Sequence, residues 1–408
     1  MKPPVALIVG AGVGGLSVAW WLNRIGWRSI VIERAGNLRM GGYMMSLSGP
    51  GFEAAQRMGL IEDLQTVRHR GGESVYHDRH GRVLLRLKHG EFMKDFPYLV
   101  LRRTDLVHAL AERVKAFSEI RLATEATTFE QRSDGVSVKL SDGATIDCDL
   151  VVAADGINSA TREAAVVSGN EVLKPLGYRF ATYDVADTLN LGANFLSYAD
   201  PGRISEYYKI SDRRLAALHI WTAGPERTPV SGGFAEVRRI FADDHPQTKA
   251  IIDAGESEGR PPMVDDMLLV EAPSWSKGRV VLAGDAAHSI SLMSGQGAGM
   301  AMTGAAVLAE ELHRHANIGA ALSAYETRMR VPVEKLQARS RSIARWFVPR
   351  TKFAFHFRNL VLRNMPSRML ANYFKRSLQS DILAASGVVL PSADRAAEVT
   401  QGSDVSNR

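Results

Sequence analysis

The sequence predicts an α/β protein in which a mainly-β domain is inserted into a Rossmann-like dinucleotide-binding domain. The first observation is an apolar run at 4–9, followed by a glycine-rich turn, a helix-like segment and a second β-rich run that ends in Glu33. This order is a βαβ unit. The second observation is the segment 176–222, which is rich in β-branched and aromatic residues with Gly, Pro and Asp breaks. The third is a return to a buried strand and a second glycine-rich loop after residue 279.

The other elements follow from hydrophobic periodicity and turn signals. Leu106, Leu110 and Val114 recur at a spacing of four, which is typical of a helix. In the first half of the chain we expect a helix at 51–66, two strands at 72–87 around the turn signal 78–81, a helix at 103–118 and three strands within 120–153. In the second half we expect about four strands within 176–222, a charged helix at 233–256 and a buried strand after 279. A helix at 297–314 and basic helical segments to about 386 follow.

Length and composition exclude several classes of protein. The 408 residues suffice for about two or three domains, and 45% hydrophobic with 23% charged residues argues against a disordered or fibrous chain. Cys148 is the only cysteine, so we expect neither an internal disulfide nor a thiolate metal site, and we predict no metal centre. No apolar run reaches the length of a transmembrane helix. The glycine-rich loop begins at residue 10, too early for a cleavable signal peptide, so we expect a cytoplasmic protein.

The first motif is the glycine-rich turn Gly10-Ala11-Gly12-Val13-Gly14-Gly15. Its glycines permit a tight turn and let backbone N–H groups approach a pyrophosphate at the positive end of the next helix. Glu33 ends the second strand and can accept hydroxyl hydrogens from an adenosine ribose, while its charge disfavours a 2′-phosphate. The candidate dinucleotide-binding residues here are Gly10, Gly12, Val13, Gly14, Gly15, Glu33 and Arg34.

Two further motifs end buried strands with an acid and a glycine. Asp155-Gly156 follows the run 151–154, and Asp155 could hold an amide or a ribose while Arg162 could hold a phosphate or carboxylate. Gly284-Asp285 follows the strand after 279, and Asp285 suits a polyol hydroxyl. A glycine-rich helix start follows it, and its amides could donate to a flavin carbonyl or a phosphate. Its candidate residues are Gly297, Ala298 and Gly299.

The three motifs in this order resemble the single-component FAD-dependent aromatic hydroxylases, the para-hydroxybenzoate hydroxylase-like or class A flavoprotein monooxygenases. The resemblance covers residues 4–330 and implies FAD as the bound cofactor and NADH or NADPH as the reductant. It also implies O2 as co-substrate and a flavin C4a-hydroperoxide that hydroxylates or epoxidises a small aromatic, polycyclic or polyketide-like molecule. Arg103 matches the arginine that reaches the FAD pyrophosphate in this family, with Arg102 as second choice. Arg39 and 41–43 match a loop that lines the mobile flavin, and 275–279 matches the usual lead-in to the Gly-Asp strand.

With FAD as the implied cofactor, the elements group into a discontinuous FAD-binding domain, an inserted β-sheet substrate domain and a C-terminal helical segment. The expected boundaries are 1–75, 98–165 and 278–335 for the FAD-binding domain, 76–97 and 166–277 for the substrate domain, 336–386 for the basic helices and 387–408 for a disordered tail.

Two positions depart from the family pattern, and no catalytic base stands out. Leu292 replaces a common proline and Gly299 a common asparagine, so the loop around the flavin can differ from that of relatives. His288 titrates near neutral pH, but it follows a buried strand and a structural role is favoured over catalysis. His108 is expected to pack or lie at the surface. Aromatic residues of the predicted sheet that could face a substrate are Tyr183, Tyr207, Tyr208, His219 and Trp221, although core packing is the commoner role of such residues.

Other functions on the same fold are open to different degrees. A flavin-dependent halogenase is disfavoured because the sequence has no W-x-W motif. A prenyl-type reductase, or a non-redox FAD-containing cyclase or binding protein, remains an alternative. Between Arg328 and Arg376 lie 13 of the 50 lysines and arginines and only one acid, Glu334. We interpret this segment as a helical cap rather than a membrane-binding surface, and no motif indicates nucleic-acid binding. The oligomeric state is not predicted.

Overall fold

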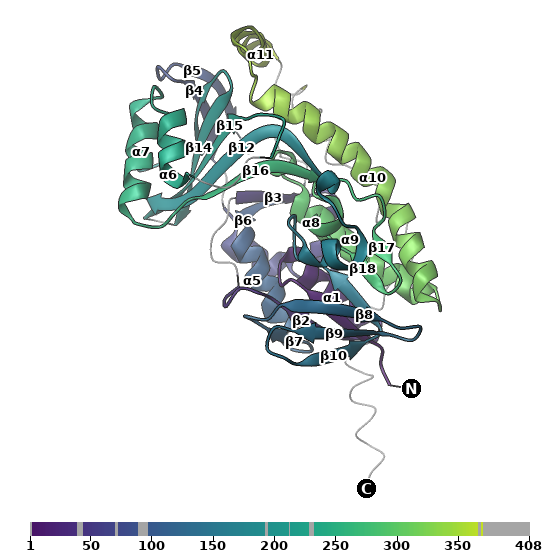
Figure 1. Ribbon diagram of the computed structural model, residues 1–408. Helices are drawn as coiled ribbons and strands as arrows, with labels where there is room; N and C mark the ends of the chain where they lie inside the picture. The colour runs from purple at the N-terminus through teal and green to yellow at the C-terminus, as the bar shows by residue number, and fades with distance from the viewer. Residues whose placement is uncertain are drawn as a thin grey trace.

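The structure is a computed structural model that describes residues 2–38, 44–69, 72–88, 97–191, 195–211, 213–227, 232–365 and 369. The loop residues Arg39 and 41–43 and the predicted tail at 387–408 lie outside the described residues. The six-stranded and the seven-stranded sheet are the two largest sheets of the described residues, and Figure 1 shows the helix labelled α10 running alongside both of them. Of the helices that the structure describes, none combines the length and the apolar character needed to cross a bilayer.

The first sheet has six strands in the order β17-β18-β11-β1-β2-β7, and it contains the βαβ unit for which the sequence predicts dinucleotide binding. All neighbouring strands pair in parallel except β17 with β18. The strands are β1 (Val5–Val9), β2 (Arg28–Ile32), β7 (Glu119–Arg121), β11 (Leu150–Ala153), β17 (Ser276–Lys277) and β18 (Val280–Leu282). The short, fully apolar run of β1 is buried because the sheet is covered on both faces.

Alternate residues of β1 enter two separate cores. Ala6 and Ile8 pack under the helices, whereas Leu7 and Val9 pack under a three-stranded antiparallel sheet. The helices on the first face are α1 (Val13–Arg24), α5 (Arg103–Val114) and α9 (Gly297–Arg314). The covering sheet consists of β8 (Ala126–Gln131), β9 (Val136–Leu140) and β10 (Thr145–Cys148), as the turn signals in that segment predict.

The second large sheet has seven strands in the order β16-β12-β15-β14-β13-β4-β5. These are β4 (Glu73–Asp78), β5 (Val83–Lys88), β12 (Leu173–Ala186), β13 (Phe195–Asp200), β14 (Arg203–Ser211), β15 (Arg214–Thr222) and β16 (Met263–Val270). Helices α6 (Gly233–Ile240) and α7 (Pro246–Ser257) cover one face of this sheet, as Figure 1 shows. Part of the other face packs against Ala344, Val348 and Phe355 of the C-terminal helices. Its edge at β12 and β16 lies toward the first sheet.

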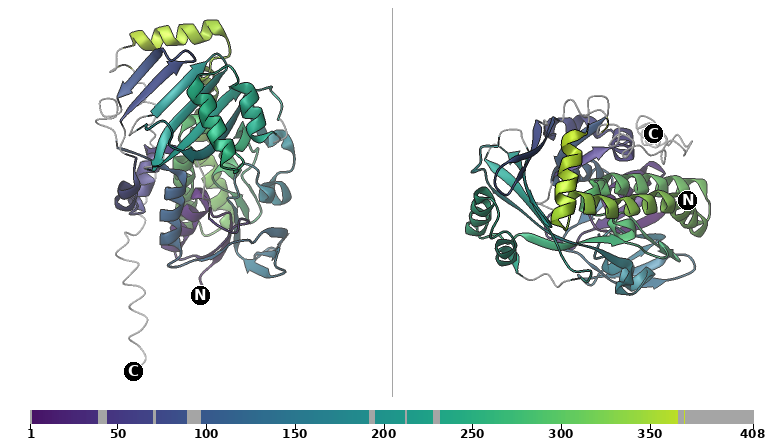
Figure 2. Two further views of the ribbon diagram at one scale, coloured as in Figure 1. Left: turned by 90° about the vertical axis from the view of Figure 1, so that its left-hand side faces the viewer. Right: turned by 90° about the horizontal axis from the view of Figure 1, so that it is seen from above.

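Short elements and two C-terminal helices connect the sheets. The smaller elements are β3 (Met44–Ser48) paired with β6 (Tyr98–Arg102), α2 (Pro50–Arg57), α3 (Ile61–Val67), α8 (Asp285–His288), the π-helical turn η1 (Arg162–Val166), and the 3-10 turns η2 (Asn170–Val172) and η3 (Leu292–Ser294). Helix α10 (Ile318–Phe347) packs against α9, and α11 (Lys352–Asn364) lies against β5 at the far end of the second sheet, as Figure 2 shows. The predicted boundaries at 75 and 335 both fall inside single elements, β4 and α10.

Candidate active site

A cavity of about 310 Å³ lies between the two large sheets. The ends of three parallel strands open onto it, with Gly12 just after β1, Asp155 after β11 and Asp285 after β18. In open α/β sheets, ligands bind outside the carboxyl ends of the strands, and this cavity has that location. Strand β16 of the second sheet closes it from the other side.

The cavity gathers most of the residues that the motifs predict. Those that line it are Gly12, Val13, Gly14, Arg34, Arg103, Asp155, Asp285, Gly297 and Ala298. The predicted residues Gly10, Gly15, Glu33 and Gly299 are not part of its lining. Each of these four lies within two residues of a lining residue in the chain, and the three glycines are held there by close backbone packing.

The glycines of the β1–α1 turn are present for different structural reasons. A Cβ on Gly10, which has a φ of 109°, would lie 2.4 Å from the carbonyl oxygen of Ala154. A Cβ on Gly15 would lie 1.9 Å from the carbonyl oxygen of Gly10, so both positions require glycine for packing. A Cβ on Gly12 would meet no atom within 4 Å. Gly12 therefore keeps open a space in the cavity wall that a bound group can enter.

Positive groups converge on the same wall. Helix α1 begins at Val13 and α9 begins at Gly297, and both residues line the cavity. A helix N-terminus presents unpaired N–H groups and the positive end of the helix dipole. The guanidinium groups of Arg34 and Arg103 add formal charge, and Arg103 lies 3.6 Å from a carboxylate oxygen of Asp285. This wall can hold an anion such as a diphosphate.

Glu33 is fixed by two backbone amides. Ala11 N donates to Glu33 Oε2 at 3.0 Å and Ala35 N donates to Oε1 at 3.0 Å. Because each carboxylate oxygen has a second lone pair, the group can still accept hydroxyl hydrogens from a ribose. The two amides hold the carboxylate beside the glycine-rich turn, a feature that the motif alone does not reveal.

The Asp-Gly motif is held together by its own side chains. Asp155 accepts hydrogen bonds from Ser159 Oγ and from Thr161 N, and it lines the cavity. Arg162 is buried and donates to the carbonyl oxygens of Ile157 at 2.9 Å and Ala286 at 3.0 Å. Arg162 thus joins the Asp155 loop to α8, and it does not line the cavity as an anion ligand would.

The loop before α9 has an unusual backbone. Ser291 has a φ of 68°, a left-handed conformation that is rare for residues other than glycine. Ser291 and Leu292 both line the cavity, so the departure at Leu292 lies in the cavity wall. Gly299 instead packs against α2, where a Cβ on Gly51 would lie 2.4 Å from the Gly299 Cα. The missing side chain at Gly299 therefore allows α2 and α9 to pack backbone to backbone.

Strand β16 contributes a part of the cavity that the motifs do not predict. Met263, Asp265, Asp266, Met267 and Leu268 come from this strand, and Phe180 comes from β12 beside it. Met44 and Met45 of β3 also line the cavity. No sequence signal marks these residues, because they reach the site only when the second sheet folds over the first.

Comparison with known proteins decides the family. A family model described as an FAD binding domain matches residues 3–340. A flavin-dependent monooxygenase from an unknown prokaryotic organism is 31% identical over 333 residues, which cover 76% of this chain and 80% of that relative. The chain belongs to the para-hydroxybenzoate hydroxylase-like, or class A, flavoprotein monooxygenases. The resemblance that the three motifs indicate is therefore confirmed, as is the FAD-binding fold.

Two further comparisons support this class A monooxygenase assignment. The 6-hydroxynicotinate 3-monooxygenase of Pseudomonas fluorescens is 30% identical over 365 residues, covering 82% of this chain and 90% of the relative. The crystal structure of the tetracycline destructase Tet(51) matches with a TM-score of 0.77 at 25% identity, covering 91% of this chain and 98% of that chain.

Most aromatic residues expected near a substrate lie on the far face of the monooxygenase's second sheet. Tyr183, Tyr207 and Trp221 pack under α6 and α7. His219 is fully buried there between Tyr183 Oη at 2.9 Å and Ser205 Oγ at 2.8 Å, and burial lowers its pKa to about 3. Tyr208 points the other way, and its hydroxyl accepts a hydrogen bond from Met44 N at 2.7 Å. Of the five candidates, only Tyr208 contacts the cavity wall.

The other single residues singled out by the sequence have structural partners. His288 is buried against Trp275, with ring centroids 4.9 Å apart, and burial lowers its pKa to about 4, so it stays neutral. Arg102 pairs with Asp105 at 2.9 Å rather than reaching the cavity. Among the described residues, no group of His, Cys, Asp and Glu side chains could hold a metal ion.

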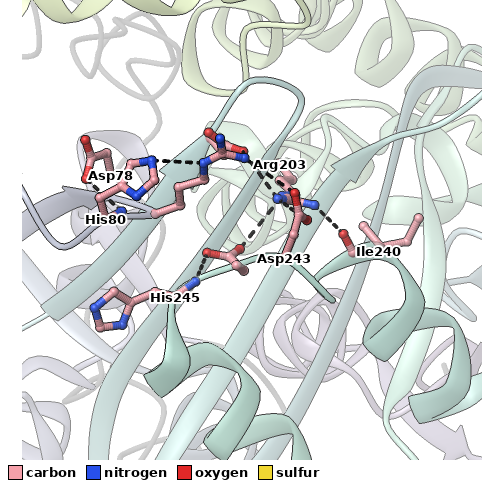
Figure 3. Close-up of polar contacts among 9 residues, drawn as sticks. Asp78, His80, Arg203, Ile240, Asp243 and His245 are labelled. Carbon is pink, nitrogen blue, oxygen red and sulfur yellow. Dashed lines mark hydrogen bonds and ion pairs between the residues drawn. The ribbon is translucent and has the colours of Figure 1, made fainter.

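A second polar cluster of the monooxygenase lies outside the cavity, at the α6–α7 side of the second sheet (Figure 3). Arg203 donates to the carbonyl oxygen of Ile240 at 2.5 Å and pairs with Asp243 at 2.6 Å. Asp244 accepts from the backbone N–H of His245 at 2.7 Å. None of these residues lines the cavity, and the cluster fastens the α6–α7 loop to the β13–β14 turn.

Proposed function

We propose that this monooxygenase holds FAD in the cavity between the sheets and uses NADH or NADPH and O2 to hydroxylate a small aromatic molecule. The observation that carries the proposal is the wall where two helix N-termini, Arg34, Arg103 and the open space at Gly12 meet. FAD, when bound, supplies the redox and oxygen chemistry, and the protein supplies position and electrostatics.

Each predicted residue then has a role toward the cofactor. Amides at Gly12, Val13 and Gly14, with Arg34 and Arg103, would hold the diphosphate, while Gly10 and Gly15 keep the turn tight. Glu33 would accept the adenosine ribose hydroxyls, and Asp285 the hydroxyls of the ribityl chain. Asp155 and the helix start at Gly297 and Ala298 would border the flavin, while Gly299 keeps this helix start packed against α2. The side chains of β16 and Phe180 would exclude water from the opposite side.

Each group of segments predicted from the sequence would then have its own function. Residues 1–75, 98–165 and 278–335 would bind FAD, and residues 76–97 and 166–277 would bind the substrate. Residues 336–386 would brace the two parts. The substrate would be flat and partly apolar, like the hydroxynicotinate or the tetracycline that the relatives' names specify.

The test is a visible spectrum of the purified protein, repeated after anaerobic addition of NADH or NADPH. We expect flavin absorption that bleaches with one of the two nucleotides, which would also identify the reductant. Oxygen uptake that rises when an aromatic substrate is added completes the assignment. A protein that stays colourless after incubation with FAD would contradict the proposal, and so would flavin that no reductant bleaches with or without substrates.

A further inference from the structure

Glu206 is a carboxyl group near the middle of the second sheet, on the same face as Phe180, which lines the cavity. Pairing between strands places it in one row with Ser197 of β13, Leu218 of β15 and Thr182 of β12. Paired residues share a face of a sheet. Thr182 pairs in turn with Met263, which lines the cavity. At about 4.8 Å per strand, Glu206 lies roughly 10 Å across the sheet from Thr182.

Few groups of the protein stabilise the charge of the Glu206 carboxylate in its buried position. Ser197 Oγ donates to Glu206 Oε1 at 3.4 Å, a long hydrogen bond. No lysine or arginine in the described part of the chain forms an ion pair with it. On the opposite face of the same sheet, by contrast, Arg179 pairs with Glu236 at 2.9 Å and Asp266 at 3.3 Å. Burial raises the pKa of Glu206 to about 7, against the smaller opposing effect of Ser197.

The polar groups around Glu206 are engaged elsewhere or titrate outside the neutral range. Tyr208, the next residue on this face of β14, accepts from Met44 N. Tyr76 of β4 is close enough that Glu206 raises its pKa further above the ordinary value. Arg358 of α11 donates to the carbonyl oxygen of Phe347 at 2.7 Å and to Asn359 Oδ1 at 2.8 Å, and burial lowers its pKa to about 10. Glu206 is thus the group in this row that titrates near pH 7.

The rows around Glu206 carry acidic and apolar groups. Along the paired rows of β12, β15, β14 and β13, the residues on the same face as Glu206 are Phe180, Ile220, Ile204, Ala199, Thr182, Leu218, Glu206, Ser197, Asp184, Ala216, Tyr208 and Phe195. Phe180 among them lines the cavity. Neither lysine nor arginine occurs in these described rows. Burial raises the pKa of Asp184 and the nearby Arg214 opposes that rise, whereas at Glu206 the opposing effect comes from Ser197 and not from a cation.

We propose that Glu206 is a specificity-determining residue that binds a protonated amine of the aromatic substrate. The inference rests on the proposed function, because it assigns the substrate class of the same cavity. An ammonium group satisfies the carboxylate that the protein leaves nearly unpaired, and charge-assisted hydrogen bonds are the stronger class. The enzyme then prefers rings that carry an amine to rings that carry a carboxylate.

The test compares three small probes on the FAD-loaded protein at pH 8: benzylamine, benzyl alcohol and benzoate. Binding is followed by the change in the visible spectrum of the bound flavin. We expect benzylamine to bind about tenfold or more tightly than the other two, and Glu206→Gln to weaken benzylamine about ten- to a hundredfold. Benzyl alcohol should bind equally to both proteins. The matched control is Glu130→Gln, an exposed glutamate on β8, which should bind all three probes like the wild type.

A pH series gives a second readout that does not depend on the variant folding. Benzylamine should bind more tightly to the wild-type protein as the pH rises from 6 to 8, because Glu206 loses its proton in this range, and the Glu206→Gln protein should show no such rise. Equal affinity for the three probes, or an unchanged benzylamine affinity in Glu206→Gln, would overturn the inference. A wild-type protein that binds and reduces FAD yet shows no amine preference overturns only this inference. A protein that binds no FAD overturns the proposed function.

Discussion

Two carboxyl groups of this monooxygenase differ in the hydrogen bonds that the protein donates to them. Glu33 receives two backbone N–H groups at 3.0 Å and stands beside the glycine-rich turn. Glu206 receives one long hydrogen bond and has a raised pKa. The first carboxylate keeps free lone pairs for hydroxyl donors, the role proposed above, whereas the second forms no ion pair with any lysine or arginine that the structure describes.

Glu33→Arg tests the first of these roles. The substitution removes the hydroxyl acceptor and places a cation beside the turn, so we expect FAD to bind about ten- to a hundredfold more weakly. Titration of the apoprotein with FAD, followed by flavin fluorescence, measures the change. Glu130→Arg is the matched control, and a melting curve checks that both variants fold. Equal FAD affinity in all three proteins would contradict the role of Glu33.

The pKa of Glu206 predicts a pH dependence of stability. Its pKa rises from 4.5 to about 7 on folding, so the folded protein holds a proton that the unfolded chain releases. The free energy of unfolding should therefore fall as the pH rises from about 4.5 to 7. Glu206→Gln should lack this contribution and gain stability relative to the wild type at pH 8. Denaturant unfolding at pH 5 and pH 8 measures the difference, and a variant that tracks the wild type at both pH values would refute it.

Elements around the cavity are held by close backbone contacts and by buried hydrogen bonds. Helix α2 approaches the start of α9 at Gly51 and Gly299, where even a methyl group has no room. Helix α10 reaches the opposite side, where Gln337 Nε2 donates to the carbonyl oxygens of Val270 at 2.7 Å and Ser289 at 3.1 Å. These contacts fix the helix start and the loop that border the cavity.

Gly51→Ala tests the contact between α2 and α9. The new Cβ would lie 2.4 Å from the Gly299 Cα, so the helices must move apart. We expect a loss of about 1–3 kcal/mol in the free energy of unfolding, the usual cost of overpacking. Gly36→Ala, where a Cβ meets nothing within 4 Å, is the control. Denaturant unfolding measures the free energy of unfolding of both variants. Equal values for the two variants would contradict a close contact between α2 and α9.

Gln337→Met tests the brace from α10. The side chain keeps its length but loses the N–H donors, so the buried carbonyl oxygen of Val270 loses this partner. We expect about 1–3 kcal/mol of destabilisation. Thermal unfolding measures the loss, and Glu334→Met, at an exposed position of the same helix, is the control. A melting temperature unchanged from that of the control would argue against the brace.

At the scale of the whole molecule, local patterns predict the nucleotide-binding half well. Gly10 to Gly15, Asp155 and Asp285 lie at strand ends, and their positions follow from short stretches of sequence. The cavity wall formed by β16 does not, because it depends on how two sheets meet. Likewise, whether Tyr183 or Tyr208 lies toward the cavity depends on which face of the second sheet α6 and α7 cover. The boundary predicted at 335 falls within α10 because that helix runs unbroken from Ile318 to Phe347.

The central claim is that the cavity at Gly12 holds FAD, and one titration tests it most directly. Gly12→Val fills the space that the turn leaves open without a clash inside the protein, since no atom lies within 4 Å of the first added carbon. Gly36→Val makes the same change at an equally open position that does not line the cavity. We predict that FAD binds to the wild type and Gly36→Val with equal affinity and at least about tenfold more weakly to a folded Gly12→Val. Equal affinity for all three proteins would contradict the account.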